Sequence, residues 1–227
     1  MKQAIDFSTQ HQTFLDVGSR RKSPNAFMLL ISNGCALIRL GKHEFVITAG
    51  SGFYIPFDCL HAVTILPGTD YSKVEFSARL TLPICRDAGY IHVNPLIASV
   101  AAELVSVIAQ DNAISLSGET GNLLRVLADQ AAKLTVSNKS ICPGLSHHYQ
   151  TPLMALLKGD KVTDSDTIAS ISQFMGYSIK EIESCILMRE ALKLSRSGRK
   201  IHYIAETLNT SQEMLIAMAD PILGHTL

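Results

Sequence analysis

The spacing of apolar residues changes near residue 95, and this change constrains the fold more than any other feature of the sequence. Over residues 26–82, short apolar or alternating runs are separated by Gly, Asn, Asp and Pro, as in antiparallel strands with tight turns. The Asn33-Gly34 pair after the first run is a strong hairpin signal. After Pro95 the apolar residues recur at helical spacing. The chain therefore joins a small antiparallel barrel or sandwich to a helical part.

Two amphipathic helices are predicted directly after the strands. The first pattern includes Leu96, Val100 and Leu104, and residues 121–134 repeat it after a polar stretch. The faces of both helices are richly apolar. Two arrangements remain open: all of this surface packs on the barrel, or part of it forms a dimer interface.

Composition and charge exclude several classes of protein. The 227 residues contain 20 Lys+Arg and 20 Asp+Glu, so binding of nucleic acid or membranes by bulk charge is excluded, whereas a local basic face is not. No apolar stretch is long enough for a transmembrane helix, and the polar start lacks the apolar core of a signal peptide. Free thiols in a reducing cytoplasm are expected from five widely spaced cysteines without a CxxC pair, namely Cys35, Cys59, Cys85, Cys142 and Cys185.

A repeat with an offset of 33 residues carries most of the information about function. Its equivalent pairs are Ile168 and Ile201, Ile171 and Ile204, Ser172 and Ala205, Met175 and Leu208, Gly176 and Asn209, Ser178 and Ser211, Ile182 and Leu215, and Cys185 and Met218.

Each pair suits one position of a helix-turn-helix. A small residue (Ser172 or Ala205) lets two helices approach closely, and Gly or Asn tolerates the left-handed backbone of the turn. Ser178 and Ser211 are placed to cap the second helix of each unit. The repeat therefore predicts two helix-turn-helix units, the alternative being two helical hairpins that read no nucleic acid.

At this point the sequence resembles the AraC-type transcriptional regulators, which place a cupin-like ligand-binding or dimerisation domain before two helix-turn-helix units. Residues 49–61 (Ala-Gly-Ser-Gly-Phe-Tyr-Ile-Pro-Phe-Asp-Cys-Leu-His) are similar to the family's Pro-Gly-x-φ-x-φ-φ-Pro-x-x-x-x-His stretch, where φ is apolar. Leu82-Pro83 with residues 91–96 resembles the segment that leads into the family's helices. Residues 191–205 resemble the end of its linker helix.

The resemblance covers most of the chain and implies an α+β fold. It implies a cupin-like antiparallel β-barrel over residues 1–94, which senses a ligand or dimerises. A helical hairpin at the dimer interface (95–135), a linker (136–151) and a degenerate tandem helix-turn-helix domain (152–227) follow. It also implies a cytoplasmic homodimer that regulates transcription, is not an enzyme, and has DNA and a small effector as partners.

Two features depart from the family pattern. In the family the two units lie about 50 residues apart, so that their recognition helices reach successive major grooves, which are about 34 Å apart. The second departure is charge, because residues 151–227 contain 8 Lys/Arg and 9 Asp/Glu. The first candidate recognition helix (178–186) has one Lys and two Glu, and the second (211–219) has Glu213 and no cation.

Basic residues nevertheless cluster after the first unit, where helical spacing brings Arg189, Lys193, Arg196 and Lys200 near one face. This face is either a phosphate-contacting stripe or a solvated surface. The candidate DNA contacts are Ser178, Lys180, Arg189, Lys193, Arg196, Arg199, Lys200 and Gln212.

Two functions therefore remain open. One is an AraC-type regulator that binds DNA, controlled by an effector in the barrel. The other is a degenerate relative without autonomous DNA binding, which acts as a co-regulator or anti-activator through protein contacts of an exposed apolar helix face (Leu215, Met218 and Ile222).

The barrel lacks the ligands of a cupin metal enzyme. Such enzymes carry a His-x-His and a Glu on one strand, whereas this barrel has His43-Glu44 and then His61, so no metal or other cofactor is expected. His61 is either a structural histidine at the start of a strand or a pocket residue. A small effector pocket is predicted among Phe27, Leu29, Tyr54, His61 and Phe76.

Overall fold

Antiparallel strands form the N-terminal part of the computed structural model, which describes residues 3–110 and 113–227. The strands are β1 (Ile5–Gln12), β2 (Asp16–Val17), β3 (Arg21–Lys22), β4 (Ala26–Asn33), β5 (Cys35–Leu40), β6 (His43–Thr48), β7 (Gly52–Ile55), β8 (Leu60–Ile65), β9 (Thr69–Phe76), β10 (Gly89–Ile91) and β11 (Val136–Ser137). The first sheet has the order β1-β9-β4-β7-β10-β11. The second has the order β2-β8-β5-β6, and β3 also pairs with β8.

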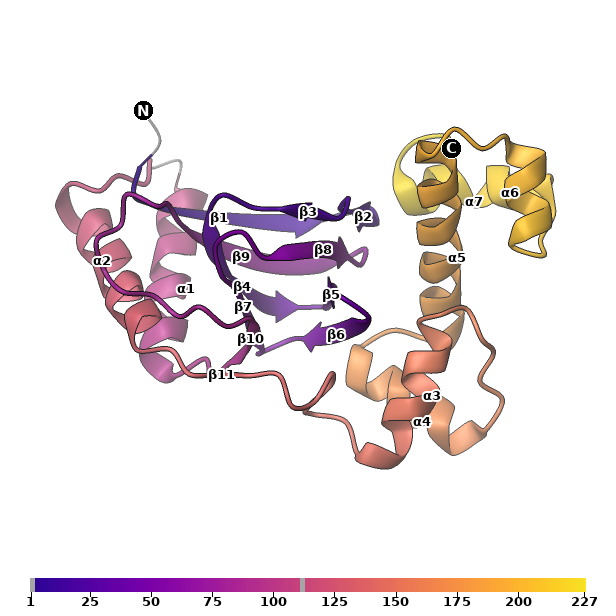
Figure 1. The fold of residues 1–227 in the computed structure, drawn as a ribbon, viewed down its shortest axis with the longest axis horizontal. Helices are drawn as coiled ribbons and strands as arrows, with labels where there is room; N and C mark the ends of the chain where they lie inside the picture. The colour runs from indigo at the N-terminus through magenta and orange to yellow at the C-terminus, as the bar shows by residue number, and fades with distance from the viewer. Residues whose placement is uncertain (1–2, 111–112) are drawn as a thin grey trace.

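Helices cover both outer faces of these sheets (Figure 1). The helices are α1 (Pro95–Ala109), α2 (Gly118–Ala132), α3 (His147–Leu156), α4 (Ser165–Met175), α5 (Ile179–Arg196), α6 (Ile201–Thr207) and α7 (Gln212–Leu223). In Figure 1, α1 and α2 lie on one side of the strands, and α3 to α7 lie on the opposite side. The α+β fold predicted from the sequence, with cupin-like strands before a helical part, is thus confirmed. Within the described residues, no helix is long and apolar enough to cross a membrane.

Strand alternation divides the apolar residues between two cores. On β4, Phe27 and Leu29 point between the two sheets, whereas Met28 and Leu30 point toward α1 and α2. The inner core also contains Phe45, Ile47, Phe53, Ile55 and Tyr90. Because β4 is covered on both faces, its sequence is almost continuously apolar.

The C-terminal helices pack directly on the second sheet. Leu37 and Val46, on its outer face, belong to the same buried cluster as Ile182 and Met188 of α5. Leu37 is 1% exposed. The helical part is therefore held against the barrel by a shared apolar core.

The two repeat units adopt the predicted helix-turn-helix geometry. Gly176 and Asn209 have φ values of 79° and 51°, in the left-handed region that each turn requires. Ser178 accepts a hydrogen bond from the Glu181 backbone N–H, and Ser211 accepts one from that of Met214. The predicted caps at the starts of α5 and α7 are therefore confirmed.

The segment predicted as a linker, residues 136–151, is more ordered than expected. It contains β11 and the first residues of α3. The Ile141 carbonyl accepts hydrogen bonds from the Val46 backbone N–H (2.9 Å) and the Tyr90 hydroxyl (2.8 Å), and Cys142 is fully buried. These contacts pack the segment against the barrel, although its polar composition is typical of a loop.

Candidate functional site

The buried guanidinium of Arg189 links the helices to the barrel. It donates to a Glu44 carboxylate oxygen (2.7 Å), the Leu157 carbonyl (2.8 Å) and Glu190 (3.0 Å). The side chains of Arg189 and Glu44 are only 4% and 14% exposed. Arg189 was predicted to contact DNA, and this prediction needs correction, because a buried guanidinium with three partners has no access to a phosphate.

The rest of the predicted basic stripe is also largely engaged within the protein. Arg196 donates to the Val17 carbonyl of the barrel, and Lys193 pairs with Glu190 at 2.8 Å. Helical spacing correctly placed Arg189, Lys193 and Arg196 on α5, whereas Lys200 lies beyond the end of this helix. The spacing did not reveal that the barrel covers part of this stripe.

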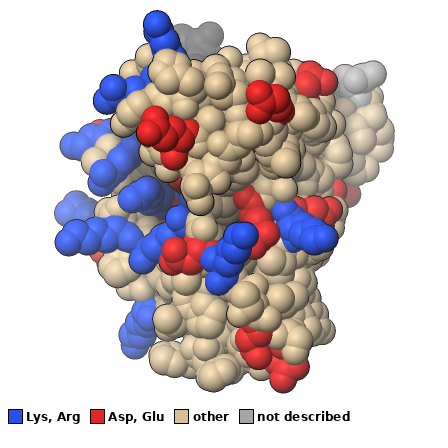
Figure 2. All heavy atoms as spheres, turned by 90° about the vertical axis from the view of Figure 1, so that its right-hand side faces the viewer, with Lys and Arg blue, Asp and Glu red and all other residues tan. Residues whose placement is uncertain are grey.

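Six of the predicted DNA contacts are exposed, namely Ser178, Lys180, Arg196, Arg199, Lys200 and Gln212. Of these, Arg196 is held by its hydrogen bond to the Val17 carbonyl. The Ser178 side chain already caps α5, and the Arg199 guanidinium lies 5.0 Å from the centre of the Tyr203 ring. Figure 2 looks onto the C-terminal helices. Lys and Arg gather along one edge of this view, and acidic residues stand among the cations near its centre. In this view the cations are therefore interrupted by carboxylates near the centre and are concentrated along the left edge.

The outward face of α7 is apolar and acidic. Met214 and Ile216 are 51% and 60% exposed, and Glu213 and Asp220 are exposed beside them. The sequence had indicated Leu215, Met218 and Ile222 as the exposed apolar face. That choice was wrong for Leu215, which is fully buried because it anchors α7 to the other helices.

A single helix, α5, serves as the second helix of the first unit and as the connection to the second unit. Its 18 residues correspond to a length of about 27 Å. Successive major grooves are about 34 Å apart. The 33-residue offset seen in the sequence therefore corresponds to one helix and a short turn between the two units.

Three of the five predicted effector-pocket residues come together in a cavity of about 160 Å³ between the sheets. They are Phe27, Leu29 and His61. The Phe27 and His61 ring centres are 5.3 Å apart. The cavity is also lined by Asp16, Gly18, Ser19, Arg21, Ser23, Val63, Ile65, Tyr71 and Lys73.

Tyr54 and Phe76 do not face this cavity, and their inclusion needs correction. Tyr54 is opposite Met28, and Phe76 is opposite Ala26, so both point to the outer face of the first sheet. The Tyr54 hydroxyl donates to the Cys85 carbonyl at 2.9 Å. The register, which the sequence did not fix, decides this orientation.

His61 is buried at the edge of the cavity in a positive environment. Burial lowers the pKa of His61, and the charges of Arg21 and Lys73 lower it further, although a 2.8 Å hydrogen bond between Nδ1 and the Cys59 carbonyl opposes this shift. The neutral imidazole is favoured, with Nδ1 assigned as the donor.

Acidification is expected to destabilise the protein through His61. The pKa of His61 is lower in the folded state than its ordinary value of 6.5 in the unfolded state. As the pH drops below 6.5, the unfolded state therefore binds more protons than the folded state, and the free energy of unfolding falls. Urea unfolding at several pH values should show a smaller loss for His61→Gln than for the natural protein. Equal losses would contradict this.

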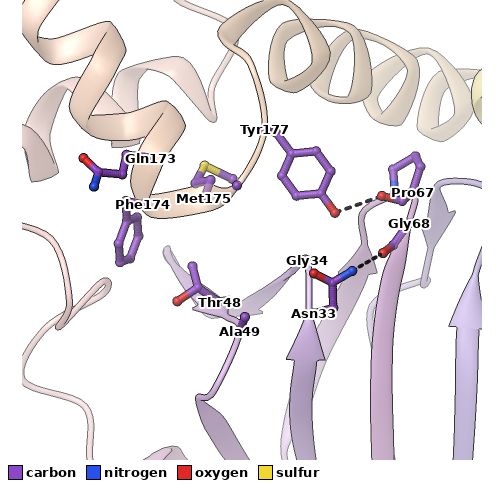
Figure 3. Close-up of a pocket in the computed structure, with 11 residues that line it drawn as sticks. Asn33, Gly34, Thr48, Ala49, Pro67, Gly68, Gln173, Phe174, Met175 and Tyr177 are labelled. Carbon is purple, nitrogen blue, oxygen red and sulfur yellow. Dashed lines mark hydrogen bonds between the residues drawn. The ribbon is translucent and has the colours of Figure 1, made fainter.

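A second cavity lies where the first helix-turn-helix meets the barrel (Figure 3), and encloses about 430 Å³. It is lined by Asn33, Gly34, Thr48, Ala49, Pro67, Gly68, Gln173, Phe174, Met175, Gly176 and Tyr177. The Tyr177 hydroxyl donates to the Pro67 carbonyl at 2.8 Å and lies 3.2 Å from Thr69 Oγ1. A Cβ atom at position 34 would lie 2.8 Å from that hydroxyl, so glycine allows the approach. Sequence reasoning missed this cavity, since it forms between distant segments.

Candidate metal ligands do not cluster: residues 3–110 and 113–227 contain no group of three or more His, Cys, Asp or Glu side chains that could hold a metal ion.

Comparisons with known proteins give structural neighbours only. Apo ToxT from Vibrio cholerae aligns with 99% of this chain and 96% of its own, at 11% identity and a TM-score of 0.41. ToxT bound to (E)-4-(8-methylnaphthalen-1-yl)but-3-enoic acid aligns with 99% of this chain and 97% of its own, at 12% identity and a TM-score of 0.40. ToxT is an AraC-family regulator.

A cupin superfamily protein from Desulfitobacterium hafniense aligns with 34% of this chain and 71% of its own, at 13% identity and a TM-score of 0.32. No protein-family model matches the chain, and no curated protein matches it.

Proposed function

We propose that the protein is a transcription regulator of AraC-like architecture that does not bind DNA on its own and acts through a partner protein. The observation that carries this proposal is the internal use of Arg189, which bonds to Glu44 of the barrel and to Leu157. One residue of the predicted basic stripe thus holds α5 on the barrel instead of facing solvent.

The second helix-turn-helix supports the same proposal. Affinity for DNA comes largely from Lys and Arg contacts to phosphates, and α7 contains neither residue. Its exposed Met214 and Ile216 would meet water or a charged backbone in a DNA complex. Exposed apolar side chains beside carboxylates are better suited to contact with a partner protein than to contact with DNA.

DNA binding remains a second candidate because Lys180, Arg199 and Lys200 are exposed. Three phosphate contacts correspond to a slope of about −2.7 for log affinity against log salt. Affinity would then fall by about 40-fold between 50 and 200 mM salt.

Selection from a random duplex library tests the proposal. We expect repeated rounds with the natural protein to enrich no sequence motif beyond that obtained with the triple variant Lys180→Ala/Arg199→Ala/Lys200→Ala. A motif enriched by the natural protein and lost in the triple variant would establish DNA reading and overturn the proposal.

The barrel cavity supports control by a small acidic effector. Arg21 and Lys73 supply positive charge at its wall, where Asp16 supplies one negative charge, and Phe27 and Leu29 supply apolar surface. Lys73 lies 4.7 Å from the centre of the Phe27 ring and 2.9 Å from Glu75. An effector carboxylate could replace Glu75 as the partner of Lys73.

Dimerisation through α1 and α2 is also proposed. Leu96 is 47% exposed, and an apolar groove of about 640 Å³ runs beside α1, with Ala98, Ala102 and Val105 along it. We expect Ala102→Arg to convert a dimer to a monomer in sedimentation velocity, without loss of helical circular dichroism. A natural protein that sediments as a monomer at high concentration would contradict the proposal.

A further inference from the structure

We infer that the cavity between the barrel and the first helix-turn-helix binds a flat, uncharged ligand with a hydrogen-bonding edge. This inference is independent of whether the helices contact DNA or a protein. The volume of about 430 Å³ lies within the range of about 300–1,000 Å³ that small-molecule sites occupy.

Aromatic and apolar side chains make two walls of the cavity. Figure 3 shows the Phe174 and Met175 side chains on one side of the space and the Tyr177 ring on another, with the barrel turn that carries Thr48 and Ala49 below. Phe174 and Tyr177 come from the end of α4 and the turn after it. Such walls favour a flat apolar body, which stacks or packs edge-on against the rings.

The lining carries no carboxylate, ammonium or guanidinium group. A charged ligand would therefore gain no counter-charge from the lining side chains, which favours a neutral ligand. The barrel cavity differs, because two cations, Arg21 and Lys73, line it together with one carboxylate, Asp16. The two cavities should therefore select ligands of different charge, one neutral and one acidic.

Two polar side chains in the lining can bond to a ligand. In the part of the chain that the structure describes, neither the Thr48 hydroxyl nor the Gln173 amide makes a side-chain hydrogen bond, and both residues line the cavity. The Asn33 amide, in contrast, donates to the Gly68 carbonyl at 3.3 Å. An amide or similar neutral group on the ligand fits the free hydroxyl and amide.

A ligand in this cavity touches the barrel and the helix-turn-helix at once. The Tyr177 hydroxyl already joins the two by donating to Pro67, and Tyr177 immediately precedes the Ser178 cap of α5. Because the ligand site exists only when the two parts are docked, binding stabilises the docked arrangement by mass action. Occupancy of the cavity therefore biases the position of the first helix-turn-helix.

Benzamide and benzoate, which have the same shape and differ in charge, are the probes. The full chain is labelled at its methionine methyl groups and titrated with each probe by NMR. Met175 lines the cavity, whereas the buried Met28 lies on the face of β4 that points toward α1 and α2 and serves as the internal reference. We expect benzamide to shift the Met175 signal in a saturable manner, and benzoate to leave it unchanged.

Three variants locate the binding site. Ala49→Phe fills the cavity from an exposed turn and should weaken benzamide binding at least tenfold, whereas Ala109→Phe, at the exposed end of α1, should not change it. Gln173→Leu should weaken it about fivefold through loss of one hydrogen bond. The inference is overturned if benzamide does not shift the Met175 signal, if benzoate shifts it equally, or if Ala49→Phe binds benzamide as the natural protein does.

Discussion

Replacing Glu44 with Ala is expected to lower the free energy of unfolding by about 3 kcal/mol, because it leaves the buried guanidinium of Arg189 without its barrel partner. Loss of one member of a buried ion pair usually costs about 3–5 kcal/mol. The lower end applies here, since Glu190 still accepts from Arg189 Nε. Urea unfolding followed by circular dichroism measures the change.

A matched double variant separates the effect of losing the Glu44–Arg189 ion pair from the effect of leaving one buried charge unpaired. Glu44→Leu combined with Arg189→Met replaces both charges with apolar groups, which is often close to neutral in stability. The double variant should therefore be more stable than Glu44→Ala. A Glu44→Ala variant within 1 kcal/mol of the natural protein would show that α5 is not held in this way.

The second large effect is expected at Leu37. This side chain is 1% exposed and lies in the cluster that joins the second sheet to the C-terminal helices. Leu37→Ala should cost about 3 kcal/mol, through lost apolar contact and the cavity left behind. Calorimetry or urea unfolding provides the value.

The conservative change at the same position is the control. Leu37→Met keeps the volume, and should cost less than about 1.5 kcal/mol. A loss below 1 kcal/mol for Leu37→Ala would mean that the helices do not pack on the sheet in solution.

Local chemistry explains what the sequence predicted correctly. The helix-turn-helix units follow from Gly176, Asn209, Ser178 and Ser211, each of which has a backbone or capping role that is independent of distant residues. The start of α1 at Pro95 is equally local. The hairpin predicted at Asn33-Gly34 was wrong, because this turn joins β4 and β5, which belong to different sheets.

The wrong predictions depended on contacts between distant segments. Helical spacing grouped Arg189 with the other cations. Only the packed structure shows that Arg189 forms an ion pair with Glu44, which is 145 residues away in the sequence. Strand pairing likewise decides that Tyr54 faces outward while Phe27 faces the barrel cavity. The junction cavity combines turns of the barrel with the end of α4, and no local pattern in the sequence indicates it.

We expect the helix-turn-helix region to have too few free cations to bind DNA on its own. Fluorescence anisotropy with a labelled random duplex, at 50 and 200 mM salt, tests it most directly. We expect at most weak binding at 50 mM, and the same weak signal for Lys180→Ala/Arg199→Ala/Lys200→Ala. Tight binding at 50 mM that falls by about 40-fold or more at 200 mM, and that is lost in the triple variant, would contradict the claim.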